Sequence, residues 1–287
     1  MDKKYDFSLI LCTLGRNEFV SNFLETIKAD SNISFEIILI DQNIDNQLKH
    51  IIKEYSNLNI KYLKSDKGLS IGRNVGLKHA SGKFIAFPDD DCEYPKNILG
   101  NVLKFFNQND YDFLTCCSRW KDNKISNGNF DIIEGKVSKY NVWNQGISYT
   151  LFVKKEAINN LTFDENIGVG SKGIFQSGEE TDFILKILKR NYRGFYLPSL
   201  FVFHPHLTQN HNDLKYRIER YTPGKCYVLK KHRFNSIYIF LFILAPFLKF
   251  IKNSTLLNSK RADLEILKFK TRLSTFFKLY FKSNLNN

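Results

Sequence analysis

A short apolar run that ends in three carboxylates constrains the fold most strongly. Residues 84–87 are uncharged, and residues 88–91 are a proline followed by three aspartates. Such a run predicts a strand buried on both faces, which is typical of a parallel sheet covered by helices. Because ligands of open α/β sheets bind beyond the carboxyl ends of the strands, we expect Asp89, Asp90 and Asp91 at a ligand-binding edge. A divalent cation would relieve their mutual repulsion, and a solvated acidic turn is the alternative.

The first hundred residues alternate between apolar runs and helical spacing. Residues 7–13, 35–40 and 60–63 are predicted strands, apolar residues recur with helical spacing around them, and another helix is expected at Pro95. This alternation predicts βαβ units and a nucleotide-binding type of sheet. Further on, we expect a long loop or short strands at 121–145 and a mobile glycine-rich loop at 168–178. A helix is predicted at 179–190, and a last strand, broken by Pro198, at 195–203.

Composition limits the class of protein. The chain has 287 residues, of which 43% are hydrophobic, enough for one large α/β core or a core with appendages. Five cysteines with no CxxC pair argue for a reducing compartment rather than a disulfide framework. The N-terminal residues show no apolar signal-peptide region, so we expect a cytoplasmic protein.

The positive charge is concentrated in the C-terminal tail. The formal net charge is +13; residues 208–287 hold sixteen Lys or Arg and four Asp or Glu, whereas the other 207 residues hold twenty-six and twenty-five. We therefore divide the chain into a domain at 1–207 and a helical, basic tail at 208–287. A basic tail can meet nucleic acid, anionic lipid or only water.

Five motifs, in this order and spacing, resemble the family 2 glycosyltransferases with the GT-A fold. They lie at residues 7–13 with Arg16, 38–41, 68–76, 87–91 and 178–182. The resemblance covers about residues 7–206. It implies an α/β domain with a GT-A type nucleotide-binding sheet flanked by helices, with a nucleotide-sugar half at about 1–95 and an acceptor half at about 96–207.

The resemblance also implies roles for individual residues. The nucleotide-sugar donor, expected to be a UDP-sugar, would be bound by Thr13, Arg16, Asp41, Arg73, Asn74, Asp89 and Asp90. Asp91, with Asp89 and His204, would hold Mn²⁺ or Mg²⁺. Glu180 or Glu179 would deprotonate the acceptor hydroxyl, with Gly178 and Asp182 on the acceptor side. The family commonly has Glu-Asp where this chain has Glu-Glu, and Glu180 occupies the place of the aspartate.

Each motif also has a purely structural reading. Asp41 could cap the helix that follows it, and residues 68–76 could form a tight turn. The acids at 179–182 could be favoured only by the helix dipole. His204 could be structural; a zinc site is not expected, because only Cys226 or His211 lies close enough in sequence to complete one with His204 and His206.

The tail combines apolar and basic residues. Residues 237–248 are uncharged, and a helix of that length would reach about 18 Å, short of the roughly 30 Å of a bilayer core. Pro246 further disfavours a straight span. From Leu264 onward, large apolar residues fit one helical face and basic residues are interspersed. We expect contact with the inner face of the membrane, and a helical hairpin packed on the catalytic domain is the alternative.

The resemblance implies a metal-dependent, inverting, hexosyltransferase-like enzyme, and the composition and the tail lead us to expect it to be cytoplasmic and peripheral to the cell membrane. It would transfer a sugar from a nucleotide-diphosphate donor to a glycan or lipid-linked acceptor in surface polysaccharide synthesis. A metal-dependent nucleotidyltransferase is one alternative, although residues 13–16 hold a single glycine where a phosphate loop would need several. A nucleic-acid-binding protein is another, but the apolar content of the tail argues against it, so no nucleic acid partner is expected.

Overall fold

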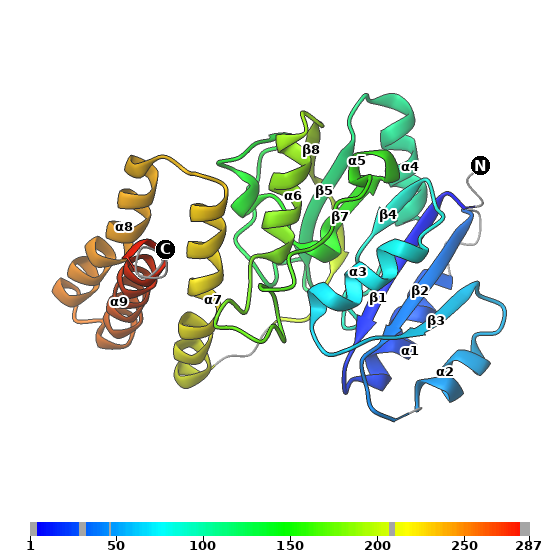
Figure 1. The fold of residues 1–287 in the computed structure, drawn as a ribbon, viewed down its shortest axis with the longest axis horizontal. Coiled ribbons are helices and arrows are strands. Elements are labelled where there is room, and N and C mark those ends of the chain that lie inside the picture. Colours follow the sequence, from blue (N-terminus) through cyan, green and yellow to red (C-terminus); the bar gives the residue numbers. More distant parts are fainter. Residues whose placement is uncertain (1–4, 29–32, 46, 207–209, 282–287) are drawn as a thin grey trace. The chain divides into compact units, whose positions relative to one another are not determined.

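The computed structural model describes residues 5–28, 33–45, 47–206 and 210–281 (Figure 1). The chain divides into two compact units. The first, which we call the sheet unit, comprises Met1–Phe163 and Phe183–Leu207. The second, the helical unit, comprises Asp164–Asp182 and Thr208–Asn287. The helical unit therefore combines the C-terminal tail with a segment from the middle of the sequence.

The described part of the sheet unit contains one eight-stranded sheet of order β3-β2-β1-β4-β7-β5-β8-β6. Strand β7 runs antiparallel to β4 and β5, and β6 runs antiparallel to β8; the other neighbours are parallel. The strands are β1 (Phe7–Thr13), β2 (Phe35–Asp41), β3 (Ile60–Lys64), β4 (Phe84–Ala86), β5 (Phe113–Arg119), β6 (Gly135–Val137), β7 (Leu151–Lys154) and β8 (Gly194–Phe203).

Helices cover the central strands, which are buried as their apolar sequences predict. All residues of β1, β2 and β4 are buried. Alternate residues of a strand face opposite sides: Leu9 and Leu11 join the core cluster with residues of α1 and α4, whereas Ile10 meets α3 at Gly76, where an added Cβ would lie 2.4 Å from the isoleucine. The helices are α1 (Asn17–Lys28), α2 (Leu48–Glu54), α3 (Leu69–His79), α4 (Ile98–Gln108) and α5 (Lys155–Ile158), together with α6 (Glu179–Lys189), whose first turn belongs to the helical unit.

One expected boundary differs from the structure, and one expected irregularity is present. The helix expected at Pro95 begins at Ile98, because Asn97 adopts a left-handed conformation before it. The last strand, β8, runs from Gly194 to Phe203, but its pairing with β5 is interrupted at Pro198, as expected. Cys116 pairs with Leu197 and the next residue, Cys117, pairs with Phe201, so residues 198–200 of β8 are skipped in the register. The stretch 121–145 contains only the short β6 and a 3₁₀ turn at Val142–Asn144, as expected; a second 3₁₀ turn follows at Ser148–Thr150.

The helical unit contains α7 (His211–Lys231), α8 (Ser236–Thr255) and α9 (Ser259–Phe281), and α9 packs against both α7 and α8. Helix α8 continues through Pro246 for twenty residues, or about 30 Å, so the length of about 18 Å expected from the sequence was too short. Within the described part of the chain, α8 alone is long and apolar enough to cross a membrane by length and composition, and only 6% of its most apolar stretch is buried.

Candidate active site

The three aspartates follow β4, at the edge of the sheet that the sequence predicts. Strands β1, β2 and β4 are parallel, and β1 lies between the other two, so their carboxyl ends meet at one edge. Asp89 continues the pairing beyond β4 through an isolated parallel bridge with Cys12. Asp41 is the last residue of β2 and Thr13 the last residue of β1. The edge therefore carries the acids of two motifs.

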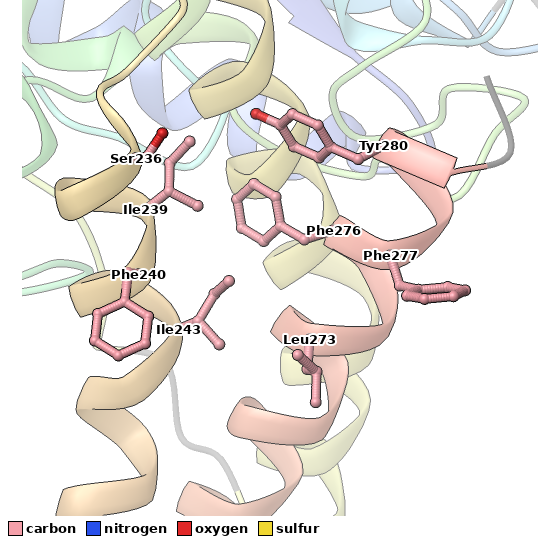
Figure 2. Close-up of a pocket in the computed structure, with 8 residues that line it drawn as sticks. All are labelled: Ser236, Ile239, Phe240, Ile243, Leu273, Phe276, Phe277 and Tyr280. Atoms are coloured by element: carbon pink, nitrogen blue, oxygen red, sulfur yellow. The ribbon is translucent and has the colours of Figure 1, made fainter. Parts of the chain in front are cut away.

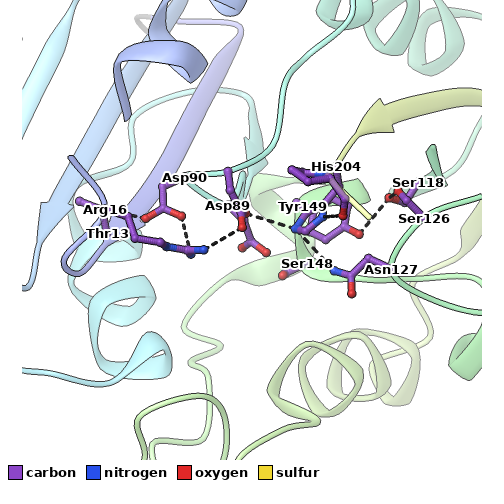
Figure 3. A network of polar contacts seen from close by, with 12 residues as sticks. Thr13, Arg16, Asp89, Asp90, Ser118, Ser126, Asn127, Ser148, Tyr149 and His204 are labelled. Carbon is purple, nitrogen blue, oxygen red and sulfur yellow. Dashed lines mark hydrogen bonds and ion pairs between the residues drawn. The ribbon is translucent and has the colours of Figure 1, made fainter. Parts of the chain in front are cut away.

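Asp90 is the most deeply buried of the three aspartates. Thr13 Oγ1 donates a hydrogen bond of 2.7 Å to its Oδ2, and Arg16 Nη2 lies 2.5 Å from its Oδ1 (Figure 3). Burial raises the pKa of Asp90 to about 6, although Arg16 and Thr13 lower it. Through these two contacts, Asp90 connects the loop after β4 with the end of β1 and the residues that follow it.

Asp91 has one basic partner on each oxygen. Arg16 Nη1 lies 2.7 Å from Oδ2, and His204 Nε2 lies 3.2 Å from Oδ1. Burial raises the pKa of Asp91, but the hydrogen bond and charge of His204 and the charge of Arg16 outweigh burial and lower it below the ordinary value. Burial lowers the pKa of His204, but the bond and charge of Asp91, with smaller contributions from the Pro205 carbonyl and Asp89, outweigh burial, so the pKa of His204 is raised. The imidazole stacks on the ring of Tyr149 at 4.8 Å between centroids.

Asp89, Asp91 and His204 could together hold a metal ion. Each offers one ligand atom, and these atoms lie within 4.8 Å of one another. Two carboxylates and one imidazole suit Mn²⁺, and the carboxylates also suit Mg²⁺. The donor set therefore fits the divalent cation that the three-aspartate motif predicts, and His204, at the end of β8, joins the aspartates as expected.

The two neighbours Arg73 and Asn74 on α3 differ in their surroundings. The Arg73 side chain is buried, with Nη2 lying 3.2 Å from Asp89 Oδ1 and 2.7 Å from Ser148 Oγ. Asn74 instead makes two hydrogen bonds with the backbone of Phe163. Its Nδ2 donates to the carbonyl oxygen at 3.0 Å, and its Oδ1 accepts from the amide nitrogen at 2.7 Å. Arg73 thus faces the aspartates, whereas these bonds of Asn74 hold the chain around Phe163.

Asp41 accepts four bonds at the end of β2. Tyr62 Oη and Lys64 Nζ lie 2.6 and 2.8 Å from its Oδ2, and the backbone and side-chain nitrogens of Asn43 lie 2.9 and 2.8 Å from its Oδ1. Burial raises the pKa of Asp41, but these bonds outweigh burial and lower it. The capping position of α2 is Gln47, so the structure does not show Asp41 as the cap of that helix.

The acidic motif in the first turn of α6 lies in the helical unit. Gly178 has a φ of +92°, which favours glycine, and the helix starts directly after it. Glu179 is buried and Glu180 is partly exposed. Asp182 is fully buried, with its Oδ1 2.8 Å from His232 Nε2 and 2.9 Å from Lys231 Nζ. Asp182 therefore joins the start of α6 to the end of α7.

Several residues around these acids were not predicted. Lys231 also lies 2.5 Å from Asp164 Oδ2, and Tyr227 donates to the same oxygen at 3.0 Å. Burial raises the pKa of Asp164, but the bond and charge of Lys231 together with two bonds from Asn166 outweigh burial and hold the pKa well below its ordinary value. In the sheet unit, Ser148 and Tyr149 lie in an apolar run that gives no sign of a polar role. Their partners are far away in the sequence, so a single sequence contains no signal for them.

The fold and the motifs define a GT-A type glycosyltransferase domain. The family model described as Glycosyl transferase family 2 matches residues 8–175, which is more than half of the chain, and the chain belongs to that family. The curated relatives include the minor teichoic acid biosynthesis protein GgaB of Bacillus subtilis (strain 168), 29% identical over 182 aligned residues; the match covers 58% of this chain and 20% of GgaB.

A second relative is the UDP-Glc:alpha-D-GlcNAc-diphosphoundecaprenol beta-1,3-glucosyltransferase WfgD of Escherichia coli. It is 27% identical over 162 aligned residues, and the match covers 55% of this chain and 59% of WfgD. The chain thus spans about a fifth of the first relative and about three fifths of the second.

Two solved structures share the fold. Residues 1–349 of S. aureus TarS in complex with UDP-GlcNAc match with a TM-score of 0.61 and 16% identity, covering 93% of this chain and 92% of that one. The mannosyltransferase PcManGT from Pyrobaculum calidifontis, in complex with GDP-Man and Mn²⁺, matches with a TM-score of 0.61 and 15% identity, covering 95% and 74%.

Proposed function

We propose that this chain is a metal-dependent, inverting glycosyltransferase of surface polysaccharide synthesis. It would transfer a sugar from a UDP-sugar to a hydroxyl of a glycan or lipid-linked acceptor. The observation that carries the proposal is the cluster of Asp89, Asp91 and His204 at the carboxyl edge of a family 2 glycosyltransferase sheet. The family match favours glycosyl transfer over the nucleotidyl transfer that paired carboxylates also allow.

In this proposal Asp89, Asp91 and His204 hold Mn²⁺ or Mg²⁺. When bound, the cation offsets the negative charge of the leaving nucleoside diphosphate. Arg73 keeps Asp89 in place through the contact of 3.2 Å, and Arg16 fixes Asp90 and Asp91. Asp41 would bind the base or ribose of the donor. These charged side chains hold the carboxylates in position before the donor arrives, which lowers the cost of binding it.

Glu180 would be the general base, with Glu179 as the alternative. Its carboxylate would take the proton of the acceptor hydroxyl as the oxygen attacks the anomeric carbon opposite the leaving group. One displacement of this kind inverts the anomeric configuration. Glu180 is the more accessible of the two acids, since Glu179 is buried, and this supports Glu180 as the group that meets an acceptor.

The names of similar proteins support the choice of donor and acceptor. TarS binds UDP-GlcNAc in one structure, and WfgD is named for a UDP-sugar and a diphosphoundecaprenol acceptor. GgaB is named for teichoic acid biosynthesis. Acceptors of these kinds lie at the membrane, and the balance of sixteen basic and four acidic residues in 208–287 supports a peripheral position on the anionic inner face.

Donor hydrolysis across a panel of UDP- and GDP-sugars, with Mn²⁺, with Mg²⁺ and with excess chelator, tests this function. We expect one UDP-sugar to be hydrolysed in the presence of either cation and none with the chelator. NMR of the released sugar, taken before mutarotation, should show the inverted anomer. A retained anomer, full activity in chelator, or release of pyrophosphate from nucleoside triphosphates with no sugar donor hydrolysed would overturn the proposal.

A further inference from the structure

An apolar cavity of about 310 Å³ lies between α8 and α9 of the helical unit. Seven of its eight lining residues are aliphatic or aromatic. In Figure 2, Ile239 and Ile243 of α8 and Phe276 of α9 lie between the two helices, whereas Phe277 points away from α8. The volume lies within the range of about 300–1,000 Å³ that is typical of ligand pockets. The lining residues are Ser236, Ile239, Phe240, Ile243, Leu273, Phe276, Phe277 and Tyr280.

The rim of this cavity is exposed although it is apolar. Phe240 is 61% exposed, Phe277 63% and Leu273 50%. Next to it on α8, Ile237 is 73% exposed and Leu241 57%. Soluble monomers rarely expose a contiguous apolar surface of this kind without a partner, so the cavity and its rim indicate a binding surface.

Charge decides which partner fits. Two copies of this chain would each bring a tail with a balance of +12, and like charges across an interface oppose association. An anionic surface would instead be attracted. Basic residues flank the apolar surface: Lys230 Nζ lies 5.0 Å from the ring centre of Tyr280 at one end, and the exposed Lys249 and Lys252 follow the apolar run of α8.

We propose that the cavity between α8 and α9 binds a hydrocarbon chain of an anionic phospholipid, with both helices lying in the headgroup region of the bilayer. The phenylalanines of the rim enter the boundary between headgroups and acyl chains, and the lysines meet lipid phosphates. The assignment rests on the peripheral position proposed above and adds a defined lipid site to it.

Tryptophan fluorescence tests the site, because both native tryptophans, Trp120 and Trp143, lie in the sheet unit. Phe240→Trp and Phe277→Trp place a reporter at the rim, and Ile132→Trp is the matched control, since Ile132 is 84% exposed in the sheet unit. With vesicles of phosphatidylglycerol and phosphatidylcholine, we expect the two rim reporters to shift to shorter wavelength. Acyl chains brominated near the headgroup should quench them more strongly than chains brominated near the terminus, and the control should not change.

A volume-filling variant tests the cavity itself. In the Phe277→Trp background, Ile243→Phe should reduce quenching by brominated chains, whereas Ile251→Phe, on the same helix outside the cavity, should not. Circular dichroism of both variants shows whether the helices remain folded. Equal quenching in both folded variants would overturn the cavity as the binding site.

Other occupants give other results, and each overturns the assignment. A spectral shift that depends on protein concentration without lipid would indicate a second copy. Quenching strongest at the chain terminus would indicate that α8 crosses the bilayer. Quenching only when polyprenyl phosphate is added would indicate the carrier of an acceptor. Donor hydrolysis by the same variants measures the proposed glycosyltransferase activity independently of lipid. Failure of the proposed activity and failure of the lipid site can therefore be distinguished.

Discussion

Asp91 is the charged centre of the cluster formed by Asp89, Asp91 and His204. It shares its two oxygens between Arg16 and His204, at 2.7 and 3.2 Å, and its own charge holds the imidazole in place. Asp89 has Arg73 as a basic partner. The basic partners of Asp89, Asp90 and Asp91 therefore offset the repulsion among the three carboxylates. A bound metal would take over part of the charge compensation that these basic side chains provide. Without a metal, Asp91 keeps its pairs with Arg16 and His204, and Asp89 keeps its pair with Arg73.

We expect Asp91→Asn to abolish transfer and to weaken Mn²⁺- or Mg²⁺-dependent donor binding, because a hard cation needs an anionic oxygen. Titration of Mn²⁺ with and without UDP-sugar, followed by electron paramagnetic resonance, measures this directly. Glu93→Gln is the matched control: Glu93 lies two residues away and pairs with Lys121 at 2.9 Å. Full Mn²⁺ binding by the Asp91 variant would remove the metal role.

We expect Glu180→Gln to leave donor binding intact and to reduce turnover by about 10² or more, the usual contribution of a positioned base. The amide keeps the shape of the side chain but cannot accept the proton. Steady-state rates with calorimetric donor affinities give the comparison, and Glu179→Gln is the control on the adjacent buried acid. If the Glu179 variant alone loses turnover, the roles are exchanged; if neither does, the motif is structural.

At the scale of elements, local pattern was enough for strands β1 to β4 and for the acids that follow β2 and β4, but it did not predict β5. The alternation of apolar runs and helical spacing predicted β1 to β4, and the turn after β4 placed Asp89, Asp90 and Asp91 at the edge. Contacts between distant segments were not predictable. Asn74 bonds Phe163, 89 residues away, and Asp182 bonds His232, 50 residues away. Such pairs depend on the tertiary fold, and a single sequence contains no signal for them.

Helix α7 is an element whose role the sequence did not indicate. Lys231, the last residue of α7, and His232, which follows it, bind Asp182 in the first turn of α6. In its middle, Gly224 lies against the backbone of Ser177, where an added Cβ would be 2.1 Å from the carbonyl oxygen. The helix therefore supports the residues immediately before and after Glu179 and Glu180 in the helical unit.

This contact gives a test with two glycines. Gly224→Ala should push α7 away from Ser177, destabilise the protein by about 1–3 kcal/mol and lower turnover, because overpacking shifts the backbone next to the acidic motif. Gly135→Ala, where an added Cβ meets nothing within 4 Å, should change neither property. Thermal melting and steady-state rates measure both. An unchanged melting temperature and rate for Gly224→Ala would mean that α7 does not constrain the acids.

At the scale of the whole molecule, the charge is divided unevenly along the chain. Residues 208–287 carry a balance of +12 and the remaining 207 residues a balance of +1. Deletion of the tail would be a poor test of its role, because α9 packs on α7 and Arg272 of α9 lies 3.7 Å from the ring centre of Phe242 in α8. Removing α8 and α9 would therefore uncover α7. Exposed charges can be changed without disturbing this packing.

We expect Lys249→Glu with Lys252→Glu to weaken binding to anionic vesicles by roughly one order of magnitude or more, because each basic residue near an anionic surface contributes about 1 kcal/mol. Both lysines are exposed on α8. Co-sedimentation with phosphatidylglycerol vesicles at low and high salt measures the effect, and salt should reduce the binding of the parent chain by screening.

The control for this pair is Lys53→Glu with Lys104→Glu, two exposed lysines of the sheet unit. It changes the net charge by the same amount, so any difference between the double variants reports the position of the charges and not their sum. If both double variants lose binding equally, attraction is a property of the net charge alone, and the tail has no special place at the membrane. If neither double variant loses vesicle binding, burial of the apolar rim around Phe240 and Phe277 contributes more to binding than charge does. Phe240 and Phe277 are then the side chains to substitute.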